Sequence, residues 1–189
     1  MGGHYLDIRL RPDPELAPHH LLAGLYARLH RALVQSARDD IGVSFPAHDE
    51  RLPSLGDHLR LHGPEASLAA LMGAHWLDGM HDHLRVGEIA PVPASALHRP
   101  VSRVQARSSS DRLRRRAMRR HGFDAEVARQ RIPDSAAQRL RLPFVVIGSR
   151  STGQPAFPLF IRHGPLSPDP VPGTFNSYGL GREATVPWF

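Results

Sequence analysis

The stretch from Val101 to Phe123, VSRVQARSSSDRLRRRAMRRHGF, holds the largest group of side chains that could act on a ligand. Ser110 or Asp111 can cap the start of a helix, Gly122 suits the position just after its end, and no proline interrupts the interval. The spacing therefore predicts a helix over residues 110–121. At about 100° per residue, one side of this helix carries five arginines: Arg112, Arg115, Arg116, Arg119 and Arg120.

So many like charges on one helix face repel one another. Pairs at i,i+3 and i,i+4 each cost about 0.2–0.5 kcal/mol in an isolated helix, and a bound polyanion would offset that cost. A solvated basic face is the ordinary alternative, but such faces usually carry interleaved acids, whereas this helix has only Asp111, in its first turn. The pattern favours nucleic-acid binding.

Two side chains that can read base edges precede this helix. Arg103 and Gln105 alternate along a predicted short strand and would share one face. Arg pairs with O6 and N7 of guanine and Gln with N6 and N7 of adenine, so the two could read adjacent purines. Exposed strand residues without a ligand are the alternative.

A candidate proton-transfer residue lies far from this stretch, in the sequence RLHR. His30 follows the apolar position Leu29 at the border of a helical apolar stripe. A boundary histidine without catalytic function is the simpler interpretation, yet a histidine beside arginines and near a phosphate can act as a general base. The polar loop GSRSTGQ offers hydroxyls that could position a phosphate or a ribose, although a plain polar turn is the alternative; they belong to Ser149, Ser151 and Thr152.

Composition narrows the possible classes. The 189 residues carry a net charge of +6, unevenly divided as −4 over residues 1–98 and +10 over 99–189, and every non-histidine basic residue is Arg. The absence of Cys excludes disulfides, thiolate zinc sites and a cysteine nucleophile. The 13 histidines form no His-Glu-x-x-His motif, so we expect scattered surface histidines and no metal site. No apolar run suits a membrane span or a secretion signal, and we expect a cytoplasmic protein.

Apolar spacing and prolines predict alternating strands and helices in the first half. His4–Leu10 alternates apolar and polar residues, as a half-buried strand does. A helix is expected over 15–38, with its apolar stripe formed by Leu21, Leu22, Leu25, Leu29, Leu33 and Val34. A second helix over 65–76 and strands over 41–45, 58–62 and 83–89 complete a β-α-β-β-α-β order. This is the ferredoxin-like arrangement, which RNA-recognition domains share with many other proteins.

The proline-rich residues 90–100, APVPASALHRP, are interpreted as a linker. We therefore expect an α+β protein with a ferredoxin-like domain over 1–95 and a C-terminal α/β RNA-binding half over 96–189. The expected elements after the basic helix are helical turns over 124–130 and 134–140 and strands over 143–147, 157–162, 174–178 and 185–189.

Many separate motifs, in order along the whole chain, resemble those of the type I-F CRISPR repeat-processing endoribonucleases of the Cas6-type superfamily. They are HYLDIRLRPDPE, ARLH, DIGVSFP, VSRVQARS, RLRRRAMRRH, RIPD, LPFV, STGQ, FIRHGPL, YGL and the terminal VPWF. The resemblance implies an enzyme that binds a stem-loop of CRISPR repeat RNA and cuts at the 3′ base of the stem without metal or another cofactor. It also implies that the product RNA stays bound and that other subunits of a surveillance complex are partners.

Roles for individual residues also follow from the resemblance. It implies that His30 is the catalytic histidine, that Ser149 is associated with the attacking ribose hydroxyl, and that Tyr178 lies near the histidine. Arg103 and Gln105 match a purine-reading pair, and the arginine stripe together with His121 matches a helix that enters the major groove of the hairpin. Contacts near the cut and at the stem base are implied for Ser151, Thr152 and Phe157.

Two other functions remain open at this stage. One is a non-catalytic RNA-hairpin-binding protein, for which removing His30 would abolish no activity. The other is a DNA-binding repressor that uses the basic helix, which would prefer duplex DNA to an RNA hairpin.

Overall fold

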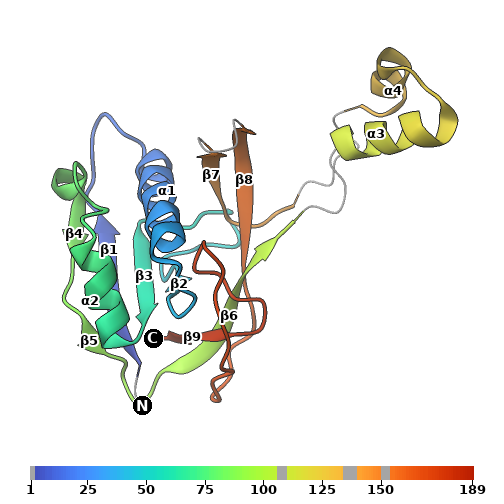
Figure 1. The fold of residues 1–189 in the computed structure, drawn as a ribbon. Helices are drawn as coiled ribbons and strands as arrows, with labels where there is room; N and C mark the ends of the chain where they lie inside the picture. Colours follow the sequence, from blue (N-terminus) through green and yellow to red (C-terminus); the bar gives the residue numbers. More distant parts are fainter. Residues whose placement is uncertain (1–2, 106–109, 134–139, 150–153) are drawn as a thin grey trace. The chain divides into compact units, whose positions relative to one another are not determined.

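The computed structural model describes residues 3–105, 110–133, 140–149 and 154–189. Over these ranges the chain is a mixed α+β protein with two antiparallel sheets and four α-helices (Figure 1). It divides into two compact units, a larger one of Met1–Val104 with Leu142–Phe189 and a smaller one of Gln105–Arg141. Within the same ranges, none of the helices has both the length and the apolar composition that crossing a membrane requires.

The first sheet uses the N-terminal part of the larger unit. Its strand order is β2-β3-β1-β4, and the short β5 also pairs with β1. The bounds are β1 His4–Leu10, β2 Gly42–Ser44, β3 His58–Gly63, β4 Leu84–Val86 and β5 Ala90–Pro91. The alternation in β1 buries Leu6, Ile8 and Leu10, which confirms the half-buried strand that the sequence predicts.

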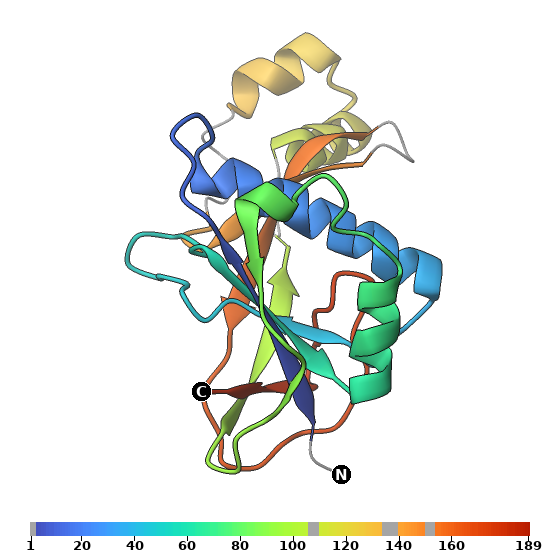
Figure 2. The ribbon, with the colours of Figure 1, turned by 90° about the vertical axis from the view of Figure 1, so that its left-hand side faces the viewer.

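Helices α1 (Pro18–Ser36) and α2 (Glu65–Gly73) pack against β1 and against each other (Figures 1 and 2). Helix α1 also packs against strand β7 of the second sheet. Its buried residues follow the helical period: Leu21, Leu22, Leu25, Tyr26, Leu29, Ala32 and Leu33. Val34, expected in this stripe, is instead 54% exposed, because the stripe is narrower than the sequence pattern suggests.

The expected start of α1 at residue 15 is wrong for a local reason. The Asp13 carboxylate accepts hydrogen bonds from the backbone N–H groups of Glu15 (2.8 Å) and Leu16 (3.0 Å), which closes a separate turn. Ala17 is extended, as residues before proline usually are, and the helix begins at Pro18, where a missing N–H costs nothing.

The second sheet has the order β7-β8-β6-β9. Its strands are β6 Leu97–Val104, β7 Phe144–Ser149, β8 Gln154–His163 and β9 Thr185–Trp188. The predicted linker is therefore wrong in part, since β5 and the first half of β6 fall within residues 90–100. Pro100 is tolerated in β6 because its carbonyl still accepts a hydrogen bond from the N–H of Gly164 (2.8 Å).

One continuous core joins the two sheets within the larger unit. Leu25 and Leu29 of α1 belong to the same buried cluster as Val101 of β6, Val145 of β7 and Leu159 of β8. The larger unit consequently contains strands from both sides of residue 95. The expected division into domains 1–95 and 96–189 stays a prediction.

The smaller unit contains α3 (Ser110–His121) and α4 (Ala125–Arg131), which pack against each other around the buried Ala128. Gly122 ends α3 in the left-handed region (φ 65°), and its N–H donates to the carbonyl of Met118 at 3.0 Å. Asp124 caps α4, since its carboxylate accepts from the N–H of Val127 at 2.8 Å. The helical turn expected over 134–140 lies almost wholly outside the described residues.

A charged network ties the first sheet to the end of the chain. Asp7 contacts His58 (Oδ1 to Nε2, 2.8 Å) and accepts two hydrogen bonds from Arg60, at 2.6 and 3.0 Å. Another Arg60 nitrogen donates to the carbonyl of Phe189 at 2.9 Å, and the guanidinium stacks over the Phe189 ring at 3.9 Å. Burial opposes ionisation of Asp7, but the His58 and Arg60 hydrogen bonds prevail and hold its pKa well below the usual range.

We expect Asp7→Asn to lower the free energy of unfolding at pH 7 by about 3 kcal/mol, because it leaves the buried Arg60 without its counter-charge. The lowered pKa of Asp7 means that its contribution is complete above the unfolded-state pKa of about 4 and is lost as the pH falls further. Urea unfolding at several pH values measures this. Asp82→Asn, an exposed site, is the matched control. A difference between wild type and Asp7→Asn that stays constant down to pH 2 would contradict the assignment.

Candidate active site

Four of the expected functional residues lie together in the larger unit, although they are far apart in the sequence. His30 comes from α1, Arg103 from β6, Phe157 from β8 and Tyr178 from the loop before β9. The His30 and Tyr178 rings stack with centroids 4.0 Å apart and planes 8° apart. The guanidinium carbon of Arg103 lies 5.9 Å from the Tyr178 ring centre and 5.6 Å from that of Phe157. We call these four residues the histidine cluster.

The hydrogen bonding of His30 defines which ring nitrogen carries its proton. Nδ1 lies 2.8 Å from the backbone carbonyl oxygen of Ser177. Because a carbonyl can only accept, Nδ1 must be the protonated nitrogen, and in the neutral ring Nε2 then holds the free lone pair. The half-buried ring therefore presents a proton acceptor in a fixed orientation.

The loop that carries Tyr178 is a tight turn, and the strand expected over 174–178 is wrong. The side-chain oxygen of Asn176 accepts from the N–H groups of Tyr178 (2.8 Å) and Leu180 (3.3 Å), which closes the turn. Gly179 adopts φ 70°, and its carbonyl accepts from the N–H of Val43 in β2 at 2.9 Å. An Asn three residues before a Gly is a turn signal that the sequence analysis missed.

The structure describes two further predicted residues outside α3, Ser149 and Gln105. Ser149 ends β7, where its backbone pairs with Gln154 across a register shift. Ser151 and Thr152 lie outside the described residues. Gln105 is exposed and lies just beyond the end of β6, so it does not share a strand with Arg103 as expected.

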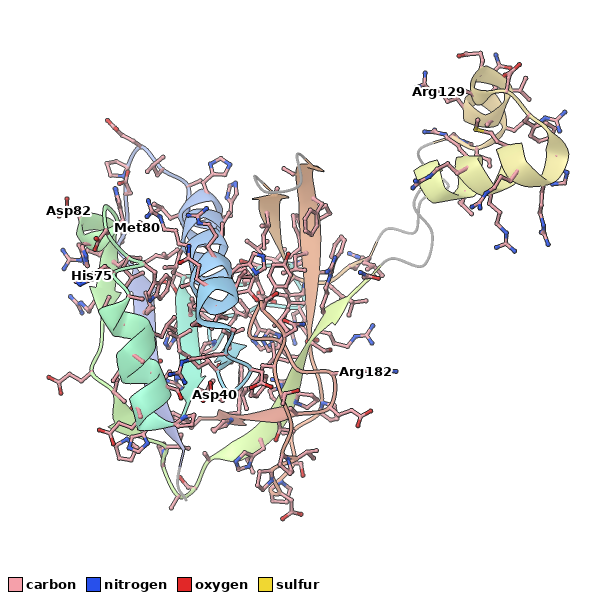
Figure 3. The ribbon with its side chains drawn as sticks, viewed as in Figure 1. Asp40, His75, Met80, Asp82, Arg129 and Arg182 are labelled. Carbon is pink, nitrogen blue, oxygen red and sulfur yellow. The ribbon has the colours of Figure 1, made fainter. Side chains whose placement is uncertain are left out.

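In the smaller unit, helix α3 separates its arginines from its apolar residues. The half-buried side chains include Leu113, Ala117 and Met118, and the exposed ones are Arg115, Arg116, Arg119, Arg120 and His121. Figure 3 shows nitrogen-ended side chains projecting from α3 and α4, among them Arg129. Arg114, which the sequence places among the apolar positions, donates from Nε to the carbonyl of Ile132 at 2.9 Å and so fastens α3 to the end of α4. The side chain of Arg112 is not among those that the structure describes.

Two further histidines, His48 and His163, lie together in the larger unit, whereas the sequence predicts scattered surface histidines. One ligand atom each from His48, Glu50 and His163 lie within 4.8 Å of one another. Two features make this a poor cation site. The two imidazoles stack face to face at 3.6 Å, so their in-plane lone pairs do not converge, and the nearby Arg99 adds positive charge. Burial first, then His48 and Arg99, lower the pKa of His163 to about 3, which keeps it neutral.

One pocket of the larger unit lies apart from the histidine cluster. It has a volume of about 980 Å3 and is lined by the start of α1, residues 53–57 and β7. None of its lining residues belongs to the four-residue cluster. Within the histidine cluster, Arg103 is exposed and the other three side chains are half-buried. A site that is open in this way suits a macromolecular ligand better than a small enclosed one.

A histidine with a defined tautomer, stacked on a tyrosine whose ring lies 5.9 Å from an arginine, suits an enzyme that moves a proton near a phosphate. Comparison with known proteins agrees with an enzyme that acts on a phosphate. The family described as CRISPR-associated protein (Cas_Csy4) matches residues 5–189. A CRISPR-associated endonuclease Cas6/Csy4 of Pseudomonas aeruginosa (strain UCBPP-PA14) is 54% identical over 186 residues, which cover 98% of this chain and 99% of the relative. A CRISPR-associated endonuclease Cas6/Csy4 of Escherichia coli (strain UTI89 / UPEC) is 45% identical with the same coverage.

The chain therefore belongs to the CRISPR-associated Cas_Csy4 family. This confirms the resemblance drawn from the motifs and, with it, the expected enzyme class, an endonuclease.

We expect Gly179→Ala to disturb the turn that holds Tyr178. Its Cβ would lie 2.6 Å from Cγ1 of the buried Val43, in addition to the strain of a positive φ. The left-handed backbone costs about 1–2 kcal/mol and overpacking about 1–3 kcal/mol more, and urea unfolding measures the sum.

Gly79→Ala is the matched control, because Gly79 has φ 77° but its added Cβ would have only a flexible Arg28 nitrogen at 4.0 Å. Its loss of unfolding free energy should reflect the strained backbone conformation alone. Equal losses of stability in the two variants would mean that the turn yields around the new methyl group.

Proposed function

We propose that this endonuclease binds the stem-loop of CRISPR repeat RNA, cleaves at the 3′ base of the stem by attack of a ribose 2′-OH, and retains the product RNA. The observation that carries the proposal is the His30 ring, whose Nδ1 is held by the Ser177 carbonyl so that Nε2 is free to accept a proton. The names of the two relatives support the same class of reaction.

The proposed chemistry needs no nucleophile from the protein. The substrate's 2′-oxygen attacks the adjacent phosphorus while His30 Nε2 takes the hydroxyl proton. The bond from phosphorus to the 5′-oxygen breaks, and that oxygen leaves as a hydroxyl after it gains a proton from solvent. The products are a 2′,3′-cyclic phosphate and a 5′-OH, so DNA, which lacks the 2′-OH, is not cut.

Tyr178 and Arg103 have distinct supporting roles in this reaction. The Tyr178 ring lies flat against His30, which fixes the ring plane and stabilises the imidazolium that forms when His30 gains a proton. Arg103 lies beside the Tyr178 and Phe157 rings, where its guanidinium can grip a phosphate or a guanine edge at the base of the stem. We assign Ser149 to holding the 2′-OH in line, with Gln105, Ser151 and Thr152 as further RNA contacts.

Metal independence is part of the proposal. The described side chains of the histidine cluster are an imidazole, a phenol, a guanidinium and a phenyl ring, and this set offers one good ligand atom for a metal ion. The internal nucleophile removes the need for a metal-activated water.

The smaller unit supplies the proposed hairpin contacts. Helix α3 presents Arg115, Arg116, Arg119, Arg120 and His121 on its exposed side, and we place Arg112 with them by spacing. An A-form major groove is too narrow for side chains along a long duplex, so α3 would enter where the stem is short or opened by its loop. Most of the affinity would then come from phosphate contacts.

A ferredoxin-like arrangement of the first sheet also belongs to this proposal. The element order β1-α1-β2-β3-α2-β4 and the strand order β2-β3-β1-β4 support it. We further propose a cytoplasmic protein whose partners, besides the RNA, are other subunits of a type I-F surveillance complex.

His30→Ala tests the catalytic proposal. It should slow single-turnover cleavage of a repeat hairpin by at least about 100-fold, the smallest effect usual for a general base, while the dissociation constant stays unchanged. The assay is run in excess EDTA, and the 3′ end of the upstream product is examined for a cyclic phosphate. A 2′-deoxy substitution at the cut is the matched substrate control. Cleavage of the deoxy substrate, or loss of cleavage in EDTA, would contradict the mechanism.

Arg116→Gln tests the role of α3. Removing one phosphate contact should weaken hairpin binding and reduce the slope of log K against log salt by about 1, because fewer counterions are released. The position of the cut should not move. Arg9→Gln, an exposed arginine on β1, makes the same charge change outside α3 and should leave the slope unchanged. A shifted cut with normal affinity would show that Arg116 positions the scissile bond instead.

A further inference from the structure

Tyr26 reaches the same turn as His30, from the same face of the same helix. The two residues are four apart on α1, so their side chains point in one direction. The Tyr26 hydroxyl donates to the carbonyl oxygen of Tyr178 at 2.7 Å, while His30 Nδ1 donates to the carbonyl oxygen of Ser177 at 2.8 Å. The consecutive carbonyls of Ser177 and Tyr178 thus accept hydrogen bonds from two side chains that lie one helical turn apart on α1.

The Tyr26 hydroxyl is well suited to act as a permanent donor. The side chain is 1% exposed, and its ring packs edge-on against Phe45 with centroids 5.6 Å apart. Burial, reinforced by Tyr178, raises the pKa of the phenol well above its usual value, so the hydroxyl keeps its proton near neutral pH. A buried hydroxyl must find a partner, and this one uses the backbone of the residue that stacks on His30.

The two hydrogen bonds constrain the histidine ring in different ways. The Ser177 bond fixes which nitrogen is protonated, but it does so only while the Ser177 carbonyl stays in place. Asn176 closes the turn from within, and Tyr26 fastens it to α1 from outside. The same backbone also places the Tyr178 ring over His30. Tyr26 binds this backbone at the Tyr178 carbonyl, one residue after Ser177.

We propose that Tyr26 is a positioning residue for cleavage, whose hydroxyl holds the 177–178 backbone so that His30 keeps Nε2 as its free nitrogen. This inference rests on the proposed function of His30 as the general base. Tyr26 does not touch the reacting atoms and acts through the turn.

Tyr26→Phe isolates the hydroxyl, since a phenyl ring keeps the packing against Phe45. The single-turnover cleavage rate at saturating protein should fall roughly three- to tenfold, the effect of losing one hydrogen bond. The dissociation constant for the hairpin should not change. In 15N-histidine NMR spectra, with the His30 signals assigned by their absence in His30→Ala, the neutral wild-type ring should show a protonated Nδ1. The variant should show an added fraction protonated on Nε2.

Tyr5→Phe is the matched control, because it makes the same change in a half-buried tyrosine that packs on Phe189, away from the histidine cluster. Rates are measured well below the unfolding midpoints of both variants, so a stability loss alone leaves them unchanged. A wild-type rate and a wild-type tautomer in Tyr26→Phe overturn the inference. If His30→Ala still cleaves, the proposed function fails, and the tautomer spectra alone then decide whether Tyr26 orients the ring.

Discussion

The hydrogen bond between His30 Nδ1 and the Ser177 carbonyl is the contact on which the candidate site depends. It joins a helix near the start of the chain to a turn near its end, and it selects one of two tautomers for a half-buried ring. A histidine free to exchange tautomers would present a base at Nε2 for only part of the time. Fixing the proton on Nδ1 turns an ordinary boundary histidine into a directed proton acceptor.

That contact is possible because α1 packs against both sheets of the larger unit. Its apolar stripe is buried in the core that the sheets share, so the helix cannot rotate without exposing Leu25, Leu29 and Leu33. His30 lies beside Leu29 and is carried by that packing to the edge of the stripe. The turn is held separately, by the Gly179 carbonyl to β2 and by the N–H of Gly181 to the carbonyl of Val101. Because α1 and the turn are each anchored to the sheets, and Tyr26 joins them to each other, they meet with a fixed geometry.

Sequence patterns predict much of this fold but not the site's geometry. The alternation in β1 and the period of α1 are local signals. β1 forms where it is expected, and α1 forms within its expected range but begins at Pro18 instead of residue 15. Gly122, which the sequence predicts just after the end of α3, is a local signal as well. The segment 174–178, expected as a strand, instead leads into a tight turn, which Asn176 and Gly179 signal in the sequence. The stack of Tyr178 on His30 joins residues 148 positions apart, and no periodicity encodes such a contact. Only the family resemblance suggested that the two residues are neighbours.

The proposed roles of the two compact units bear on whether the product RNA would stay bound. The arginines of α3 lie in a unit that contains none of the four residues of the histidine cluster. If α3 grips the stem and the cut falls at its 3′ base, cleavage removes no phosphate that α3 contacts. The affinity present before the cut would then remain after it, because under the proposal it comes mainly from phosphate contacts along an intact stem. Fast turnover would require that affinity to be weaker. An enzyme built in this way is expected to act once and remain bound, which suits a processing step whose product continues as a complex with the protein that made it.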